Sequence, residues 1–394
     1  EQRQPSTALP TASSGGAGSI TRFDGTGWRT LDLKAIYRLD DIAHEISFGA
    51  HGDRYDLANN RFSTANWISG PVGALASAAR GKTQTGALWA QDFWTINPAL
   101  RLTTGLRWER WKAFDGLNYS LSPTLNVRQP EVDARKLSPK AALAWDFAPD
   151  WTARVSLGEA YRFPTVGELY QAITTGSTLT IPNPNLKPEK SRQFSTGLVF
   201  EPNANMSFGL DYWSITKRDL ISTLGVDVIL AHLDKYANLV HRDEDNAIDH
   251  IDLIKQNRGQ ERMSGLDLTA QLSRIATPIG LMGLRFNGTY TMKSEQQMGN
   301  GDPFVSNLGR FLNDGVVQRW RHTLSVDWER GNWGASRRFV QLTPRTSNPC
   351  VGSVLTPHIT SPTSVRLFAS SVSCASSASQ QLGATPTRQI TNVP

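Results

Sequence analysis

The 394-residue chain is 39% hydrophobic, but it contains no uninterrupted run of about eighteen apolar residues, which excludes a transmembrane helix. Its formal charge of +6 comes largely from five arginines after Ser336, so the rest of the chain holds 36 basic and 35 acidic residues and lacks the basic stripe of a nucleic-acid-binding surface. Membrane-crossing strands are not excluded, because each needs only about ten residues with every second one apolar.

Residues 1–26 are rich in Ser, Gly, Thr and Pro, and we expect a loop or linker there. Alternation begins in residues 30–38, where Leu31, Leu33, Ala35 and Tyr37 share one face and polar residues share the other. A period of two indicates a strand with one apolar and one polar side. The pattern recurs at 101–109, 140–147, 194–200, 206–212, 266–272, 284–290 and 324–328. We predict roughly twelve strands, mostly of about ten residues.

The connections between these strands alternate between short and long. Tight turns are predicted at 40–41, 97–98, 148–150, 202–204, 277–278 and 330–332. Long segments lie between them, at 57–80, 112–137, 160–189, 217–258 and 294–317. This alternation is not expected of a soluble sandwich or propeller. It is typical of a membrane barrel, which has short periplasmic turns and long extracellular loops. The sequence therefore predicts an all-β, antiparallel transmembrane β-barrel.

Tryptophans lie near several of the predicted strand ends, namely Trp94, Trp111, Trp151, Trp328 and Trp333. Aromatic rings gather at the boundary between lipid and water, so we predict that these residues form a girdle there. The alternative is that tryptophan is simply common in β proteins.

The C-terminal stretch, residues 337–394, has no acidic residue, Trp or Tyr and is rich in Ser, Thr and Pro, so we predict a disordered tail. The last strand of a barrel must pair with the first, or two edges lie open in lipid. We therefore expect a partial, unclosed barrel over residues 27–336. The abrupt change at Ser336 favours a reading-frame shift over a genuine low-complexity extension.

Three motifs occur in order along the chain. The first runs from Leu137-Ser138-Pro139-Lys140 to Tyr161-Arg162-Phe163-Pro164-Thr165-Val166-Gly167-Glu168-Leu169-Tyr170, the second is Asn183-Pro184-Asn185-Leu186-Lys187-Pro188-Glu189-Lys190, and the third is Asn257-Arg258-Gly259 leading into Ser264-Gly265-Leu266-Asp267-Leu268. Thr165 and Glu168 have the spacing that caps a helical turn, and Pro184 and Pro188 favour an extended approach to the next strand. Together the motifs resemble the C-terminal part of the β-barrel domain of TonB-dependent outer-membrane receptors.

This resemblance implies active uptake of a scarce nutrient, such as a ferric siderophore or cobalamin, across the outer membrane of a Gram-negative bacterium. It also implies three partners: outer-membrane lipid, the TonB energy-transducing complex and an extracellular ligand such as a metal chelate. It implies no enzyme activity, cofactor or nucleic acid. The sequence shows neither a plug domain nor an energy-coupling box, so we expect this chain to be incompetent for transport alone and not to insert stably. A passive porin-like barrel and a soluble β protein are the alternatives.

No catalytic, cofactor-binding or metal-binding residue is predicted, although four groups of residues have the types that such sites use. Residues 241–252 hold two histidines and five acidic residues, which could bind a cation, but we favour an extracellular hairpin that turns at 244–246 with solvated charges. His51 near Asp53 is a weak candidate for a hydrolase, and residues 299–302 lack the lysine of a phosphate-binding loop. Polar residues predicted to line the lumen are Lys34, Arg101, Arg107, Glu109, Lys140 and Arg154.

Overall fold

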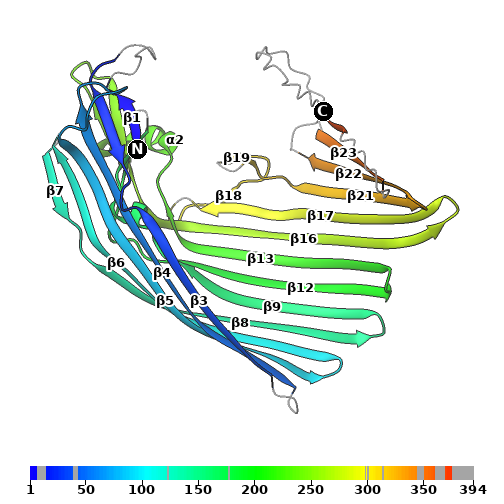
Figure 1. Ribbon diagram of the computed structural model, residues 1–394. Coiled ribbons are helices and arrows are strands. Elements are labelled where there is room, and N and C mark those ends of the chain that lie inside the picture. Colours follow the sequence, from blue (N-terminus) through cyan, green and yellow to red (C-terminus); the bar gives the residue numbers. More distant parts are fainter. Residues whose placement is uncertain are drawn as a thin grey trace.

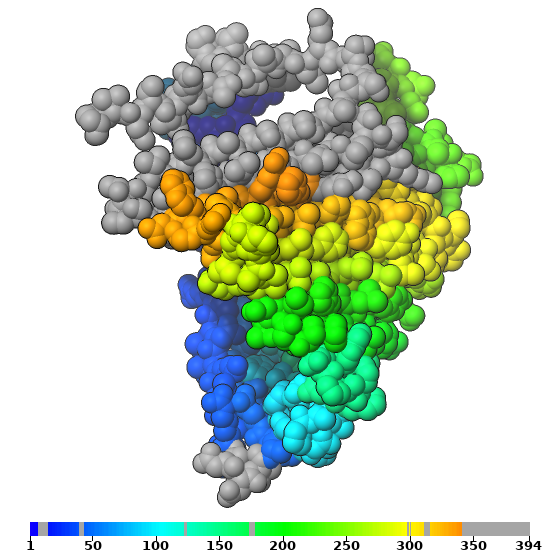
Figure 2. All heavy atoms as spheres, turned by 90° about the vertical axis from the view of Figure 1, so that its right-hand side faces the viewer, coloured from blue at the N-terminus to red at the C-terminus, as the bar shows by residue number. Residues whose placement is uncertain are grey.

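A computed structural model describes residues 1–6, 15–38, 43–121, 124–175, 178–297, 299, 301–312, 315–343, 350–359 and 369–374. Eighteen strands in this part of the chain form one antiparallel sheet that curves into a trough (Figure 1). Figure 2 faces the hairpin ends of the strands and shows the wall running from the N-terminal strands in blue to the C-terminal strands in orange. Within the described residues, β3 pairs only with β4 and β24 only with β23, so the sheet is unclosed, as predicted.

Twelve long strands of 11 to 23 residues make up the wall and confirm the predicted number. They are β3 (Gly27–Arg38), β4 (His44–Thr64), β5 (Leu75–Asn97), β6 (Leu100–Leu121), β8 (Val132–Ala148), β9 (Trp151–Arg162), β12 (Glu189–Asn203), β13 (Met206–Ser222), β16 (Gln256–Thr277), β17 (Gly280–Gln297), β21 (Trp320–Arg330) and β22 (Trp333–Thr343). The predicted length of about ten residues was too short, because backbone ladders continue past the segment where side chains alternate.

The short connections fall where the sequence predicted them. β5 ends at Asn97 and β6 begins at Leu100, and the four later hairpins of the wall turn just as tightly. Asp150, Gly280 and Gly331 have positive φ angles of 64°, 134° and 59°, which tight turns between strands require. The turn predicted at 40–41 lies outside the described residues.

The long connections contain regular structure of their own. The elements are β7 (Thr124–Arg128), α1 (Val166–Tyr170), β10 (Ile173–Thr175), β11 (Thr178–Ile181), α2 (Val226–Ala231), α3 (Leu233–Tyr236), η1 (Ala237–Leu239), β14 (Val240–Arg242), β15 (Ile248–Ile254), β18 (Val305–Ser306), β19 (Phe311–Leu312) and β20 (Gly315–Val316). Strands β10, β11, β15 and β14 form a separate four-stranded sheet. Much of the loop predicted at 57–80 is instead strand, because β4 continues to Thr64 and β5 begins at Leu75. No helix among the described residues is long and apolar enough to span a membrane.

The N-terminal segment differs from the predicted loop. It contains β1 (Gln2–Pro5) and β2 (Gly18–Arg22). β2 pairs with the end of β4 that extends beyond β3, with Gly18 opposite Thr64, and its Ile20 is fully buried. Composition could not reveal these strands, because β2 forms its backbone hydrogen bonds with β4, about forty residues later, and β1 pairs with β2.

The C-terminal strands also cross the predicted boundary. β22 runs through Ser336 and pairs with β21 along its length, and β23 (Cys350–Ile359) and β24 (Ala369–Cys374) continue the sheet. The strand pattern therefore does not end at Ser336, because backbone pairing with β21 does not require alternating apolar side chains. The rest of the tail lies outside the described residues, so its predicted disorder and the frame shift stay predictions.

The two faces of the wall differ as the alternation predicts. The outer face carries apolar side chains that nothing in the described chain covers: Leu106, Leu143 and Leu198 are 48%, 39% and 41% exposed. Cross-strand pairing aligns such residues in rows, for example Leu198 opposite Leu210 and Leu210 opposite Leu268. An apolar outer face over so many strands is what contact with hydrocarbon requires.

Aromatic rings lie on this face beside the tight turns. Trp145, Phe147, Trp151, Phe200 and Phe208 form a chain of contacts with centroid separations of 4.6–6.3 Å. Trp94, Trp328 and Trp333 lie at strand positions of the same face. Trp111 was wrongly assigned to the predicted girdle, because it is only 2% exposed and stacks on Phe163 on the inner face.

Candidate functional site

The loop after β9 folds inward onto the wall and begins with helix α1. Thr165 caps this helix: its Oγ1 accepts a hydrogen bond from the Glu168 backbone N–H at 3.2 Å, and Glu168 Oε2 accepts one from the Thr165 backbone N–H at 2.8 Å. This reciprocal arrangement confirms the capping box predicted from the sequence.

Arg162, at the end of β9, ties α1 to the neighbouring strands. Its guanidinium contacts Glu168 at 3.0 Å and Glu189 of β12 at 2.6 Å. Glu189 Oε1 also accepts a hydrogen bond from the backbone N–H of Ile221 in β13, at 2.7 Å. Burial alone would raise the pKa of Glu168, but Arg162 and Thr165 outweigh it and lower that pKa. Two of the sequence motifs therefore meet at one charged contact.

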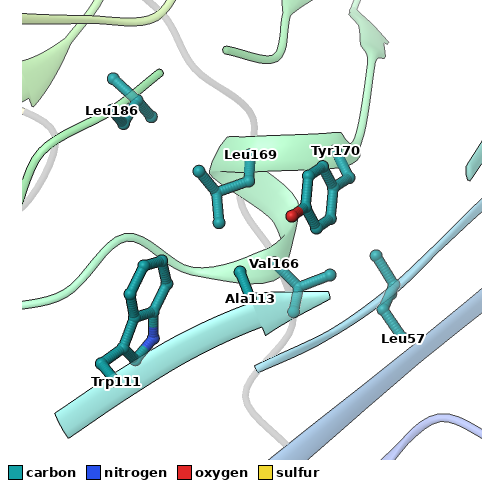
Figure 3. Packing of buried hydrophobic residues seen from close by; sticks show 7 residues of the cluster. All are labelled: Leu57, Trp111, Ala113, Val166, Leu169, Tyr170 and Leu186. Carbon is teal, nitrogen blue, oxygen red and sulfur yellow. The ribbon is translucent and has the colours of Figure 1, made fainter. Parts of the chain in front are cut away.

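A buried cluster lies beneath α1 on the inner face of the wall (Figure 3). Its members are Leu57, Trp111, Ala113, Val166, Leu169, Tyr170 and Leu186. The three α1 residues are fully buried, and they bring together β4, β6 and the second motif's Leu186. We had not predicted that this loop packs against the inner wall, although the alternation of β6 does place Trp111 and Ala113 on that side.

Tyr170 is the centre of this cluster. Its hydroxyl donates a hydrogen bond to the Pro130 carbonyl at 3.1 Å, and its own backbone carbonyl accepts one from the Asn118 side chain. Burial raises the pKa of Tyr170 to about 12, so the phenol is neutral at ordinary pH. Gly81 and Gly116 face the ring, and a Cβ at either position would lie within 3.0 Å of it. The absence of side chains there makes room for the helix.

Below this cluster, the predicted lumen residues form ion pairs across the inner face. Arg101 contacts Asp146 at 2.9 Å, Arg107 contacts Glu109 at 2.8 Å, and Arg154 donates to Asp211 at 2.8 Å. Lys34 and Lys140 line one hollow together with Arg107. The inner wall is thus polar, as the alternation predicted, and its arginines at these three contacts are paired with carboxylates.

The contacts of His51 and of residues 299–302 are structural. His51 lies between Asp32 and Asp53, with its ring nitrogens 2.6 Å and 3.3 Å from the two carboxylates. The imidazole lies between the carboxylates of Asp32 on β3 and Asp53 on β4, and neither contact involves the hydroxyl or thiol that would serve as a hydrolase nucleophile. The Asp302 N–H donates to the Gly299 carbonyl at 3.2 Å, which makes this segment a tight turn. Asn300 lies outside the described residues.

The acidic and histidine-rich segment forms the hairpin that the sequence predicted, between β14 and β15. Asp243 Oδ1 accepts hydrogen bonds from the backbone N–H groups of Asp245 and Ala247, and Asn246 has a positive φ of 63°. Sequence reasoning treated all these charges as solvated. It missed that His241 and His250 are opposite one another and that Asp252 lies on the same face. The two-residue spacing of His250 and Asp252 was the available signal.

The curved antiparallel wall, apolar outside and polar inside, has the architecture of a barrel-type membrane protein. The chain belongs to the family described as TonB dependent receptor-like, beta-barrel, which matches residues 2–367. This match begins before residue 27 and continues past Ser336, so the family region is wider than the 27–336 predicted. Members of the family are transport receptors of the Gram-negative outer membrane, not enzymes.

Two hemin receptors are among the similar proteins. The one from Yersinia pestis is 31% identical over 172 residues, which is 39% of this chain and 24% of the receptor. The one from Yersinia enterocolitica is 29% identical over 170 residues, 39% of this chain and 23% of the receptor. The match therefore spans about a quarter of the length of these relatives.

Solved receptors share the fold. The ferric yersiniabactin uptake receptor FyuA from Yersinia pestis has a TM-score of 0.53 at 14% identity, covering 87% of this chain and 48% of that one. The copper transporter OprC has a TM-score of 0.57 at 15% identity, covering 87% and 50%. The Serratia marcescens hemophore receptor HasR, solved with its hemophore HasA and heme, has a TM-score of 0.53 at 15% identity, covering 86% and 56%.

Proposed function

We propose that this chain forms part of the barrel of an outer-membrane receptor that takes up a metal chelate, with haem as the preferred substrate. The family match over residues 2–367 supports the receptor role. The structural observation that best supports a membrane location is the apolar outer face of the wall. Its Leu106, Leu143 and Leu198 side chains are between 39% and 48% exposed. Burying such a surface in lipid is favourable, whereas leaving it in water is costly.

The substrate proposal departs from the siderophore or cobalamin suggested by sequence alone. Support for haem comes from the two hemin receptors, which are similar to this chain over 172 and 170 residues. The solved receptors named above bind several different ligands, so their shared fold does not distinguish among them. Haem is therefore the first ligand to test, with a ferric siderophore and cobalamin beside it.

Two partners are proposed for the chain. Outer-membrane lipid would cover the apolar face, and the TonB complex would drive transport in the whole receptor. The chain covers 48% to 56% of the solved receptors, and we propose that it binds ligand at its loops without transporting it by itself.

The test exports the 394-residue chain to the envelope of a Gram-negative host that cannot synthesise haem. In contrast to the expectation from sequence that the chain does not insert stably, we propose that it does insert, because its exposed apolar outer face is favourably buried in lipid. It is therefore expected in the outer-membrane fraction, with a gel mobility that changes on heating. It should increase hemin binding by whole cells without supporting growth on hemin. Recovery of the folded chain in the periplasmic soluble fraction would overturn the membrane role. Binding of cobalamin or a siderophore in place of hemin would overturn only the substrate, and growth on hemin would overturn the limit on transport.

A further inference from the structure

We propose that His241, His250 and Asp252 bind a divalent transition-metal ion, such as Zn²⁺, on the hairpin β14–β15. The ligand atoms of these three residues lie within 4.8 Å of one another. Two imidazoles and one carboxylate are ligands that zinc and similar ions prefer. This site does not depend on the chain's role in haem uptake.

The backbone holds the three side chains on one face of the hairpin. His241 of β14 is directly opposite His250 of β15, and Asp252 follows two residues later on the same strand. Between them, Ile251 points to the other face, where it is 3% exposed and packs with Leu224 and Ile229. β15 also pairs with β11, with Asp252 opposite Leu179, so the strand that carries two of the ligands is internal to its sheet. The three side chains are therefore placed together by the pairing and alternation of the strands.

The hydrogen bonds around His250 leave a metal-binding nitrogen available. Its Nδ1 is 2.7 Å from Asp249 Oδ2, and since a carboxylate only accepts, the proton of the neutral imidazole lies on Nδ1 and the lone pair on Nε2. That Nε2 lies 3.7 Å from Asp252 Oδ1, too far for a hydrogen bond. In tetrahedral zinc sites with bonds near 2.0–2.1 Å, two ligand atoms are separated by about 3.3 Å. The observed gap is close to that spacing.

Asp252 supplies a second, independent observation that points to a cation ligand. Its Oδ1 is buried and has no hydrogen-bond partner within the described protein. A buried carboxylate oxygen without a partner is costly, and an ion at this position would satisfy it together with the His250 lone pair. Asp252 Oδ2 is 2.9 Å from His241 Nε2, so the third ligand already approaches the same carboxylate. The His241 side chain is 44% exposed, which leaves a path for an ion to enter.

The geometry favours a free ion over haem iron at this place. The two imidazole rings are stacked, with centroids 4.3 Å apart and planes at 10°. Two histidines that ligate one haem must approach the iron from opposite sides of the porphyrin, and stacked parallel rings do not do so.

The test titrates Zn²⁺ into the full chain, purified without a polyhistidine tag and refolded into lipid vesicles, by calorimetry. One equivalent of tightly bound Zn²⁺ is expected, and Co²⁺ in its place should give the visible absorption of a tetrahedral site. His250→Ala and Asp252→Asn should each weaken binding by at least about tenfold, while His232→Ala, in the same loop, leaves it unchanged. Asp249→Asn should weaken binding by about 10- to 100-fold, and Asp249→Glu should restore it, as expected of a positioning residue.

Folding is controlled by requiring the same heat-dependent gel shift in every variant. Failure of the folded wild-type chain to bind one equivalent of Zn²⁺ would overturn the proposal. Equal Zn²⁺ binding by wild type, His250→Ala and Asp252→Asn would overturn it as well, since the ion would then lie elsewhere. Hemin binding is measured separately on the same samples, so loss of the zinc site and failure of haem recognition are distinguishable.

Discussion

Arg162, the last residue of β9, forms a two-point ion pair with Glu168 of α1, with its Nη1 and Nη2 at 3.0 Å and 3.1 Å from the two carboxylate oxygens. A paired guanidinium and carboxylate fix an orientation as well as a distance. The contact therefore sets how the loop after β9 enters the inside of the trough.

The cap of α1 can be tested by removing one hydroxyl. Thr165→Ala loses the hydrogen bond that Oγ1 accepts from the Glu168 N–H, and the loss of such caps costs about 1 kcal/mol. We expect faster hydrogen exchange at residues 166–170, measured by mass spectrometry. Thr124→Ala, in a neighbouring loop strand, is the matched control and should change exchange very little. Unchanged exchange in Thr165→Ala would show that the cap does not hold the helix.

The pH dependence of the same helix follows from Glu168, whose pKa is lowered in the folded chain. A carboxyl with a lowered folded pKa stabilises the fold fully above its ordinary value and loses that contribution as the pH falls through the folded value. Cleavage by pepsin between Leu169 and Tyr170 should therefore increase below pH 4.5, relative to cleavage in the exposed loop at Leu233. Glu168→Gln should remove this pH dependence, and a variant that retained it would assign the transition to another group.

The space left for Tyr170 gives a sharper packing test. A Cβ at Gly81 would lie 2.5 Å from Tyr170 Cδ2, whereas a Cβ at Gly86, on the same strand, has nothing within 4 Å. Gly81→Ala should thus cost about 1–3 kcal/mol through overpacking, and Gly86→Ala should cost far less. Urea unfolding of the vesicle-inserted chain measures both. Equal stabilities for the two variants would contradict the packing of α1 against β5.

The outer face predicts opposite responses to charge at adjacent positions of β8. Leu143 faces outward and is 39% exposed, while Ala142 lies on the inner face beside Thr103 and Ser156. Leu143→Arg should cost about 2–4 kcal/mol if it lies near the middle of the bilayer, and Ala142→Arg should be tolerated in the aqueous interior. Folding yields in vesicles measure the difference. A larger loss for Ala142→Arg would reverse the assignment of the faces.

Much of the wall follows from local sequence. Alternation at residues such as Leu31, Leu33 and Leu106 identifies the strands, and Pro149-Asp150 or Thr277-Pro278 identify the hairpins, because both signals act within a few residues. The capping box at Thr165 and Glu168 was likewise readable, since its two hydrogen bonds join residues three positions apart.

Contacts between distant segments could not be read in this way. Trp111 was assigned to the lipid boundary from its position near a strand end, but its burial depends on α1, which lies more than fifty residues later in the chain. The ladder between β11 and β15 and the pairing of β2 with β4 depend on the same kind of long-range partner. The proposed metal site combines a local and a long-range feature. Its hairpin was predicted from the sequence, whereas the buried, unpartnered oxygen of Asp252 is evident only from the structure.

The central claim is that one face of the wall meets hydrocarbon and the other meets water. Spin labels placed singly at residues 152–157 of β9, in a chain whose Cys350 and Cys374 are replaced by Ser, test it in lipid vesicles. We predict high accessibility to oxygen at 153, 155 and 157 and high accessibility to a water-soluble nickel complex at 152, 154 and 156. Labels at 153, 155 and 157 that are shielded from oxygen and immobilised by protein would contradict the membrane-facing wall.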